Sequence, residues 1–407
     1  MRTIFTALLL ALALLGPKSV AAQGVEAGFR PFLENQIWPQ ARSQGVSRAT
    51  FDAALGNVRP NLRLPDLVLP GQSAGVSENQ HQAEFQSPHA YFNSIDGVVS
   101  RGRSLLQQHA GLLQRIEQRY GVPGPVVLAV WGRESAFGSA SIPHDAFEVL
   151  ATKAYLARRR EMFTAELIAA LRIVEEGHKT PSQMKSSWAG ALGQPQFMPT
   201  KFLELAVDFD GDGRKDIWNS VPDTLASIAN YLRQSGWVPG RDWGFEANVP
   251  DNVSCTLEGP DQGRPISQFV NAGVTRVSGR PFPANETNAQ GFLMMPAGRY
   301  GPAFIATPNF YVIKEYNNSD LYALFIGHAA DRMRGGGPFQ GDWVRVDGLT
   351  RGDVARMQER LVAQGRDVGG VDGLPGFKTR RSIGAFQEAS GMPATCWPSR
   401  ELKGRLG

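Results

Sequence analysis

The chain has 407 residues, of which 42% are hydrophobic and 20% charged, as in ordinary soluble globular proteins. Its length predicts two or three domains rather than one core. The formal charge is +4, and 40 basic residues face 38 acidic ones if Arg2 and Lys18 leave with a leader. So small an excess is weak support for any polyanionic partner, and we expect no nucleic acid among the partners.

The N-terminus has the features of a signal peptide. A short positive end is followed by an apolar run over residues 4–15 and by small residues up to Ala22. This pattern predicts a signal peptide over residues 1–22; a buried N-terminal helix is the alternative. The run is too short for a membrane span, and no later segment is apolar enough for one. No Cys follows it to carry a lipid, so we expect an exported protein without a lipid anchor.

Hydrophobic residues recur at helical spacing through much of the chain. Residues 61–90 are rich in Pro, Gly, Ser and Gln, which predicts an extended loop, and residues 238–315 favour loops with a few short strands. We expect helices within residues 23–60 and at 98–120, 126–136, 146–157, 161–176, 199–206 and 222–235.

A run of glycines at 335–337 followed by Pro338 indicates a linker, and residues 346–407 are expected to form a separate small helical unit. Hydrophobic positions that share helix faces there are Val354, Met357 and Leu361, and then Ile383 and Phe386. The two cysteines, Cys255 and Cys396, are too few for a metal site. An even pair in an exported protein is compatible with a disulfide, but the sequence leaves the pairing open because it does not show whether the two approach.

Glu134 follows an apolar helix. It lies three and four residues after Trp131 and Val130, so it continues their apolar face. A carboxylate in such a place is costly unless it is paired or protonated, and burial raises its pKa, which suits a general acid. The alternative is a structural Glu paired with a neighbouring Arg.

A second segment, residues 187–199, reads Ser-Trp-Ala-Gly-Ala-Leu-Gly-Gln-Pro-Gln-Phe-Met-Pro. Small residues let a backbone come close to a ligand, while amide and aromatic groups provide the contacts that sugars need. A tight Gly-rich core turn is the alternative. Together with the Glu134-Ser135 pair, this segment resembles the lytic murein transglycosylases of the B type, over residues 24–334. The resemblance implies a lysozyme-like fold that is mainly α, with a few short strands, and a Gram-negative periplasmic location.

The family cleaves the β-1,4 bond between N-acetylmuramic acid and N-acetylglucosamine in peptidoglycan glycan strands. Its single Glu protonates the leaving oxygen and then takes a proton from the muramyl 6-hydroxyl, which closes a 1,6-anhydro ring. By this resemblance Glu134 is the acid/base, and no second carboxylate is required, unlike in two-carboxylate glycosidases. The substrate-binding residues that the resemblance implies are Ser187, Gln196, Phe197, Tyr231, Tyr316, Asn317, Tyr322 and Arg159, with Arg159 directed to an acidic peptide stem or lactyl group.

Residues 208–216 resemble the start of an EF-hand calcium loop, with alternating carboxylates and a glycine at 213 for the sharp turn. The twelfth position is Asn219 instead of Glu. An acidic turn without metal is the alternative. No cofactor is expected for catalysis, and the ligands of a structural Ca²⁺ would be Asp208, Asp210, Asp212, the carbonyl of Arg214, and Asp223, with Asp216 bound through water.

The segment from Asp372-Gly373 to Phe386-Gln387 resembles the peptidoglycan-binding module of wall hydrolases. Gly384 departs from that pattern and is expected to weaken its helix slightly. The expected organisation is a signal peptide (1–22), a catalytic domain (23–335), a linker (336–345) and a peptidoglycan-binding helical bundle (346–407). The alternatives to a lytic transglycosylase are a muramidase that uses water, and a wall-binding scaffold without catalysis.

Overall fold

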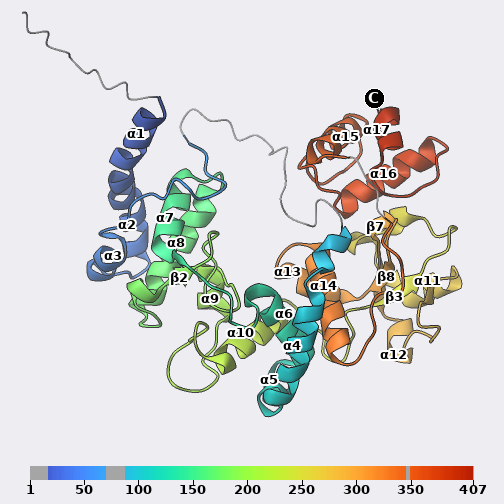
Figure 1. Ribbon diagram of the computed structural model, residues 1–407, viewed down its shortest axis with the longest axis horizontal. Helices are drawn as coiled ribbons and strands as arrows, with labels where there is room; N and C mark the ends of the chain where they lie inside the picture. Colours follow the sequence, from blue (N-terminus) through green and yellow to red (C-terminus); the bar gives the residue numbers. More distant parts are fainter. Residues whose placement is uncertain (1–16, 70–87, 345–348, 407) are drawn as a thin grey trace, which may run out of the picture. The chain divides into compact units, whose positions relative to one another are not determined.

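The computed structural model describes residues 17–69, 88–344 and 349–406, with side chains from residue 24 onward. Most of the predicted signal peptide, residues 1–16, lies outside this part of the chain. The described residues form two compact units (Figure 1). Unit 1 comprises residues 17–69 and 142–204, and unit 2 comprises residues 88–141 and 205–406. Within the described residues, none of the helices combines the length and the apolar character that crossing a membrane requires.

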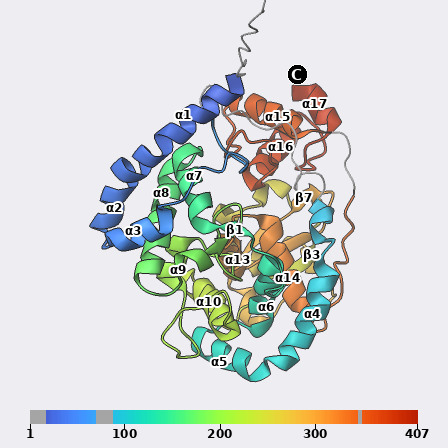
Figure 2. The same ribbon diagram turned by 60° about the vertical axis from the view of Figure 1, so that its left-hand side comes forward.

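Unit 1 is built from helices that pack around α7 and α8 (Figure 2). The Asp145 carboxylate caps α7 by accepting hydrogen bonds from the N–H groups of Phe147 and Glu148. Nine of the eleven residues of α7 are buried, which explains its almost wholly apolar sequence. The elements of unit 1 are α1 (Pro17–Phe32), α2 (Trp38–Ser43), α3 (Arg48–Leu55), β1 (His144–Asp145), α7 (Ala146–Leu156), α8 (Arg160–Glu175), β2 (Lys185–Ser186) and α9 (Pro199–Leu205).

The helical prediction for residues 23–60 holds, with one irregularity. A π-helical turn, Leu33–Ile37, separates α1 from α2 and follows Pro31, which lies inside α1. Proline has no backbone N–H and its ring opposes regular α-helical packing, so the wider turn occurs where the regular ladder is interrupted.

Unit 2 has a helical half whose centre is α6 (Gly124–Ser135). This helix packs against α4, α5, α10 and α14, and its residues 126–132 are all buried. That burial on every side is why the segment is apolar all round rather than on one face. The other helices of this half are α4 (Ile95–Gln108), α5 (Ala110–Tyr120), α10 (Val221–Gln234), α13 (Pro308–Glu315) and α14 (Asp320–Met333).

Two predictions for unit 2 were wrong in detail. The single helix expected over 98–120 begins at Ile95 and is broken at His109, whose backbone (φ −109°, ψ 21°) is not helical. Residues 308–315, expected as loop or strand, form α13. Its start is fixed by the Thr307 hydroxyl, which accepts a hydrogen bond from the Asn309 N–H (3.2 Å), and by Pro308 in the first turn.

The remainder of unit 2 contains a five-stranded sheet in the order β4-β6-β8-β3-β5, with every neighbouring pair antiparallel. Phe245 pairs with Ile305, which in turn pairs with Leu293, and these residues belong to a second hydrophobic cluster. The short strands expected in this region are therefore present. The elements are β3 (Gly244–Asn248), β4 (Arg264–Pro265), α11 (Ile266–Asn271), β5 (Thr275–Arg276), α12 (Ala284–Thr287), β6 (Gln290–Met294), β7 (Pro296–Arg299) and β8 (Ala303–Ala306).

The C-terminal residues form three helices, α15 (Arg351–Ala363), α16 (Phe377–Ala389) and α17 (Arg400–Leu406). Thr350 and Asp353 cap α15 reciprocally, as a capping box. Met357, Leu361 and Ile383 share a small core, against which Phe386 packs. The helical bundle predicted here is confirmed.

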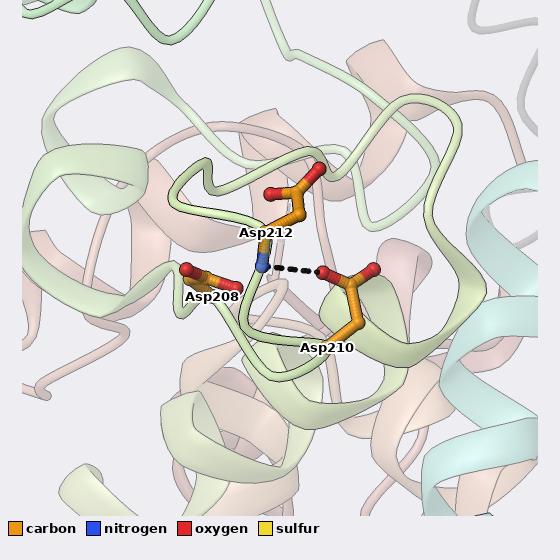
Figure 3. A group of neighbouring side chains, drawn as sticks. All are labelled: Asp208, Asp210 and Asp212. Carbon is orange, nitrogen blue, oxygen red and sulfur yellow. Dashed lines mark hydrogen bonds between the residues drawn. The ribbon is translucent and has the colours of Figure 1, made fainter.

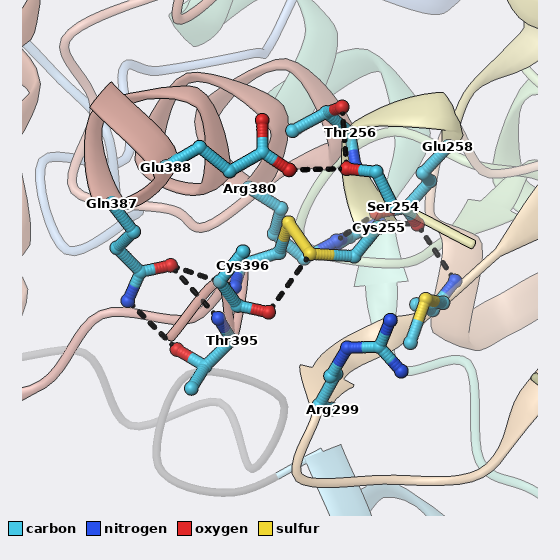
Figure 4. The surroundings of a disulfide bond; sticks show 12 residues. Ser254, Cys255, Thr256, Glu258, Arg299, Arg380, Gln387, Glu388, Thr395 and Cys396 are labelled. Carbon is cyan, nitrogen blue, oxygen red and sulfur yellow. Dashed lines mark hydrogen bonds and ion pairs between the residues drawn. A yellow bond between two sulfur atoms is a disulfide. The ribbon is translucent and has the colours of Figure 1, made fainter. Parts of the chain in front are cut away.

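A disulfide joins Cys255 to Cys396, so the pairing that the sequence left open is made (Figure 4). It links the C-terminal residues to a short turn beside the sheet. Gly384 of α16 lies against this bond: a Cβ on Gly384 would meet Cys396 Sγ and lie 2.9 Å from Thr256 Cγ2. The glycine expected only to weaken the helix therefore allows the helix to approach the disulfide.

Candidate active site

Glu134 lies in the last turn of α6, directly before a sharp bend. Ala136 (φ 48°) and Phe137 (φ 60°) are both left-handed, although neither is glycine. Ser135 supports this bend, because its hydroxyl accepts a hydrogen bond from the Gly138 N–H (3.0 Å). Strained backbone of this kind persists where the surroundings fix it, often at active sites. Ser135 is thus a structural residue beside Glu134.

The Glu134 carboxyl has one hydrogen-bond partner in unit 2. Tyr322 of α14 donates its hydroxyl to Glu134 Oε1 over 2.5 Å. Burial raises the pKa of Glu134 to about 7, an effect that the Tyr322 hydrogen bond and the charge of Arg133 oppose. A carboxyl with this pKa is partly protonated near neutral pH, so it can both donate and recover a proton.

Two further tyrosines, Tyr316 and Tyr231, form a row of aromatic rings with Tyr322. The Tyr316 ring is stacked on the Tyr322 ring with centroids 6.2 Å apart and planes 11° apart, and it contacts the Tyr231 ring at 4.6 Å. Tyr231 of α10 donates its hydroxyl to the Glu315 carbonyl over 2.9 Å. Burial and the Glu134 charge raise the pKa of Tyr316 and of Tyr322 well above 10, so both remain phenols that can donate hydrogen bonds.

The segment between α13 and α14 carries Tyr316 and Asn317. It turns at Asn318, which has a left-handed backbone (φ 52°). Lys314 before the turn and Asp320 after it form an ion pair of 2.7 Å. This pair fixes both ends of the turn, which we call the 315–319 turn.

The segment 187–199 lies in unit 1. The Ser187 hydroxyl accepts hydrogen bonds from the N–H groups of Ala189 and Ala191. Leu192 and Phe197 exchange two backbone hydrogen bonds, which makes a very small hairpin. At its tip Gln196 is left-handed (φ 54°), and its amide donates to the Gly193 carbonyl. Phe197 is buried, so it serves as the packed base of this hairpin.

Trp188 and Lys153 form a pair that the sequence reasoning did not single out. Trp188 is 44% exposed, while Lys153 behind it is buried. The Lys153 ammonium lies 4.9 Å from the Trp188 ring and 5.2 Å from the Phe163 ring, and donates to the Pro65 carbonyl. The Arg159 guanidinium also lies over the Phe163 ring, 5.9 Å from its centroid. The sequence signal that could have identified this surface is the large indole of Trp188 between the small residues Ser187 and Ala189.

The structure brings part of the predicted site together. Glu134, Tyr231, Tyr316 and Tyr322 lie side by side in unit 2, with Asn317 on the adjoining turn. The other four predicted substrate residues belong to unit 1, and their approach to Glu134 stays a prediction: Ser187, Gln196, Phe197 and Arg159.

The predicted calcium loop lies in unit 2, before α10 (Figure 3). Carboxylate oxygens of Asp208, Asp210 and Asp212 all lie within 4.8 Å of one another, and hard oxygen ligands of this kind suit Ca²⁺. Gly213 has φ +89° and open space around its Cβ position, as the turn requires. Asp223 is buried, and its carboxylate accepts hydrogen bonds from the backbone N–H groups of residues 209, 210 and 216. It therefore holds the backbone of the acidic loop in place.

Two known families match separate parts of the chain. The Transglycosylase SLT domain family matches residues 28–331, and a peptidoglycan binding domain family matches residues 350–402. Because the first match covers well over half of the chain, this protein belongs to the SLT-domain transglycosylases. The predicted resemblance to lytic transglycosylases of the B type, and the predicted fold class, are confirmed.

Individual relatives agree with that family. Membrane-bound lytic murein transglycosylase B of Escherichia coli K12 is 32% identical over 237 residues, which are 56% of this chain and 62% of that protein. The chain thus matches less than two thirds of the length of this curated relative.

Solved structures are similar over more of the chain. SltB3 of Pseudomonas aeruginosa in complex with NAG-anhNAM-pentapeptide is 38% identical with a TM-score of 0.80, covering 95% of this chain and 99% of SltB3. Escherichia coli Slt35 in complex with calcium is 27% identical with a TM-score of 0.59, covering 77% and 92%.

Proposed function

We propose that this protein cleaves the β-1,4 bond between N-acetylmuramic acid and N-acetylglucosamine in peptidoglycan and leaves 1,6-anhydromuramyl ends, with Glu134 as acid and base. The observation that carries the proposal is the Glu134 carboxyl itself. Burial raises its pKa to about 7, and the Tyr322 hydroxyl is bonded to one of its oxygens. The other oxygen, Oε2, is then available for the glycosidic oxygen.

The charges around Glu134 favour a one-carboxylate mechanism. Among the described residues of unit 2, Arg133 is the charged group that shifts the pKa of Glu134, and no acidic side chain of this unit does so. A retaining two-carboxylate glycosidase would hold a second carboxyl about 5 Å away, and that carboxyl would raise this pKa further. The surroundings of Glu134 in unit 2 are instead aromatic and phenolic.

The proposed reaction balances without water. Protonated Glu134 gives its proton to the bridging oxygen as the bond from that oxygen to muramyl C1 breaks. The carboxylate then takes the proton of the muramyl 6-hydroxyl, whose oxygen forms the new bond to C1. Glu134 ends protonated again. The Tyr322 hydrogen bond stabilises the carboxylate between the two transfers, when the site is most in need of a donor.

Glycan contacts are proposed for both units. In unit 2, Tyr231, Tyr316 and Asn317 would contact the glycan near Glu134. In unit 1, the proposed glycan contacts are Ser187, Gln196 and Phe197 of the hairpin. Arg159 would meet an acidic peptide stem. Trp188 adds an exposed indole on which a sugar ring can stack. The SltB3 complex with NAG-anhNAM-pentapeptide supports this class of ligand.

The organisation proposed for the whole chain is a leader (1–22), a catalytic domain (23–335), a linker (336–345) and a wall-binding domain (346–407). Family matches over residues 28–331 and 350–402 support the middle and last parts. The disulfide supports export to an oxidising compartment, which we propose is the periplasm.

We also propose a structural Ca²⁺ at the acidic loop. The side chains of Asp208, Asp210 and Asp212 and the carbonyl of Arg214 would hold it, and buried Asp223 would close the site or brace the loop. The calcium complex of Slt35 supports the choice of ion. The ion would stabilise the loop before α10 and take no part in bond cleavage.

Mass spectrometry of muropeptides released from purified sacculi tests the proposal, with Glu134→Gln as the matched control. We expect 1,6-anhydromuramyl products from the wild-type protein and almost none from the variant, because an amide neither donates nor recovers the proton. A hydrated reducing end would identify a muramidase. Binding to sacculi without products from either protein would identify a wall-binding scaffold.

A further inference from the structure

Arg380 is a buried residue of α16, inside the C-terminal module that matches the peptidoglycan binding family (residues 350–402). Its guanidinium donates to both Glu258 oxygens, over 2.6 and 2.9 Å, and to Asp320 Oδ2 over 3.1 Å. Both carboxylates lie outside the module. A buried guanidinium is tolerated when its donors are satisfied, and a fourth bond, to the Pro375 carbonyl (2.7 Å), helps to meet that requirement.

Asp320 connects Arg380 to the helices that carry the proposed active-site residues. It is the first residue of α14, and its other oxygen, Oδ1, is 2.7 Å from the Lys314 ammonium near the end of α13. Asp320 therefore holds together the two helices that flank the 315–319 turn, and Arg380 holds Asp320. Four charged groups share this cluster: Arg380, Glu258, Asp320 and Lys314. Because each is ion-paired with another member, the movement of any one of them removes at least one ion pair from a partner.

The side chains next to Asp320 are those of the proposed active site. Tyr322, two residues further along α14, donates the hydrogen bond to Glu134, and Tyr316 from the 315–319 turn is stacked on the Tyr322 ring. A shift of the start of α14 would lengthen a hydrogen bond that is now 2.5 Å and would separate the two rings.

We propose that Arg380 is a positioning residue for the acid/base, so that the C-terminal module contributes to bond cleavage as well as to wall binding. The proposal rests on the proposed function of Glu134. The disulfide and the close approach at Gly384 act in the same direction, because they hold α16 against the catalytic part of unit 2.

The test measures kcat and KM on a defined glycan in the full-length mature protein. Arg380→Met removes the charge, and Asp320→Asn breaks the relay while leaving the Arg380–Glu258 pair intact. Arg381→Met is the control, since Arg381 is the next residue of α16 and forms a more exposed ion pair with Asp261. Displacement of catalytic groups on the order of 1 Å costs about 10²-fold in rate. We expect kcat to fall roughly ten- to one-hundredfold for the first two variants, with KM within about twofold, and Arg380→Lys to recover part of the loss.

Several outcomes would overturn the proposal. These are a wild-type kcat in folded Arg380→Met and Asp320→Asn proteins, a loss confined to KM or to sacculus binding, or an equal loss in Arg381→Met. Circular dichroism and thermal unfolding establish folding, and Asp320→Asn provides the answer if Arg380→Met does not fold. The Glu134→Gln control separates the two ideas: if wild type makes anhydro products and Glu134→Gln does not, the proposed function stands whatever the Arg380 variants do.

Discussion

The Tyr322 hydroxyl donates a 2.5 Å hydrogen bond to Glu134 Oε1, across 188 residues of sequence. Glu134 ends one buried helix and Tyr322 begins another, and these two helices, α6 and α14, pack directly against each other. The Glu134 carboxyl thus meets the Tyr322 phenol inside the helical core of unit 2, and the Tyr316 ring is stacked on that phenol. The opposed effects of burial and of this hydrogen bond determine the pKa of Glu134, and each can be tested separately.

Tyr322→Phe removes the hydrogen bond that lowers the pKa of Glu134 and so opposes the effect of burial. The pKa of Glu134, now about 7, should rise, because the carboxylate loses a donor that stabilises its charged form. In the proposed reaction Glu134 is protonated at the start, so kcat/KM is expected to fall as pH rises through this pKa. We expect that falling limb to move to higher pH in Tyr322→Phe, while the maximal rate drops by roughly tenfold or more because the acid is less well held.

Tyr120→Phe is the matched control for that pH profile. The Tyr120 hydroxyl is buried in unit 2 and has no hydrogen-bond partner among the described residues. Its removal should leave the falling limb in place. A limb that stays fixed in Tyr322→Phe, or that moves to lower pH, would show that this bond does not govern the acid.

Part of this site could be predicted from the sequence and part could not. Glu134 could be singled out as a candidate because it continues an apolar helical stripe, and the resemblance to the lytic transglycosylases then favoured it over a structural Glu. The helix α13 was missed, although Thr307 and Pro308 are a recognisable helix start, because the region around it is rich in glycine and short apolar runs. The contact between Arg380 and Asp320 leaves no periodic trace, since it depends on how residues 60 positions apart pack. The pairing of Cys255 with Cys396 could not be predicted for the same reason, since these residues are 141 positions apart.

Glu134→Gln should stabilise the protein in a pH-dependent way. The pKa of Glu134 is raised from 4.5 to about 7, so the folded state binds more protons than the unfolded state between these values. Wild-type stability therefore falls as pH rises through this window, and the loss is complete above pH 7. At about 1.4 kcal/mol for each pKa unit, the difference approaches roughly 3 kcal/mol. Thermal or urea unfolding of both proteins at several pH values measures it. A stability difference that is constant from pH 4.5 to 8 would contradict the raised pKa.

Asp208→Asn combined with Asp212→Asn tests the calcium loop. In the wild-type protein, calcium should raise the unfolding temperature and a chelator should reverse the effect, since an ion that binds only the folded state stabilises it. The double variant should show neither response, and its activity on glycan should stay near that of wild type in the chelator. Asp251→Asn is the control, because Asp251 is an exposed aspartate outside the acidic loop. Asp145 is unsuitable as a control because its carboxylate caps α7. Equal calcium responses in the double variant and wild type would exclude this site.

Removal of the disulfide should weaken the attachment of α16 to the turn at Cys255. The bond closes a loop of 141 residues, and loss of a native disulfide typically costs about 2–5 kcal/mol. Cys255→Ala with Cys396→Ala should therefore unfold at lower denaturant than oxidised wild type, and reductant should lower wild type to the same level without affecting the variant. Gly384→Ala adds a sharper test, because its Cβ would meet Cys396 Sγ. We expect Gly384→Ala to cost more in the oxidised wild-type background than in the double-alanine background, where that sulfur is absent. Equal costs in both backgrounds would mean that Gly384 is not needed for the approach of α16 to the disulfide.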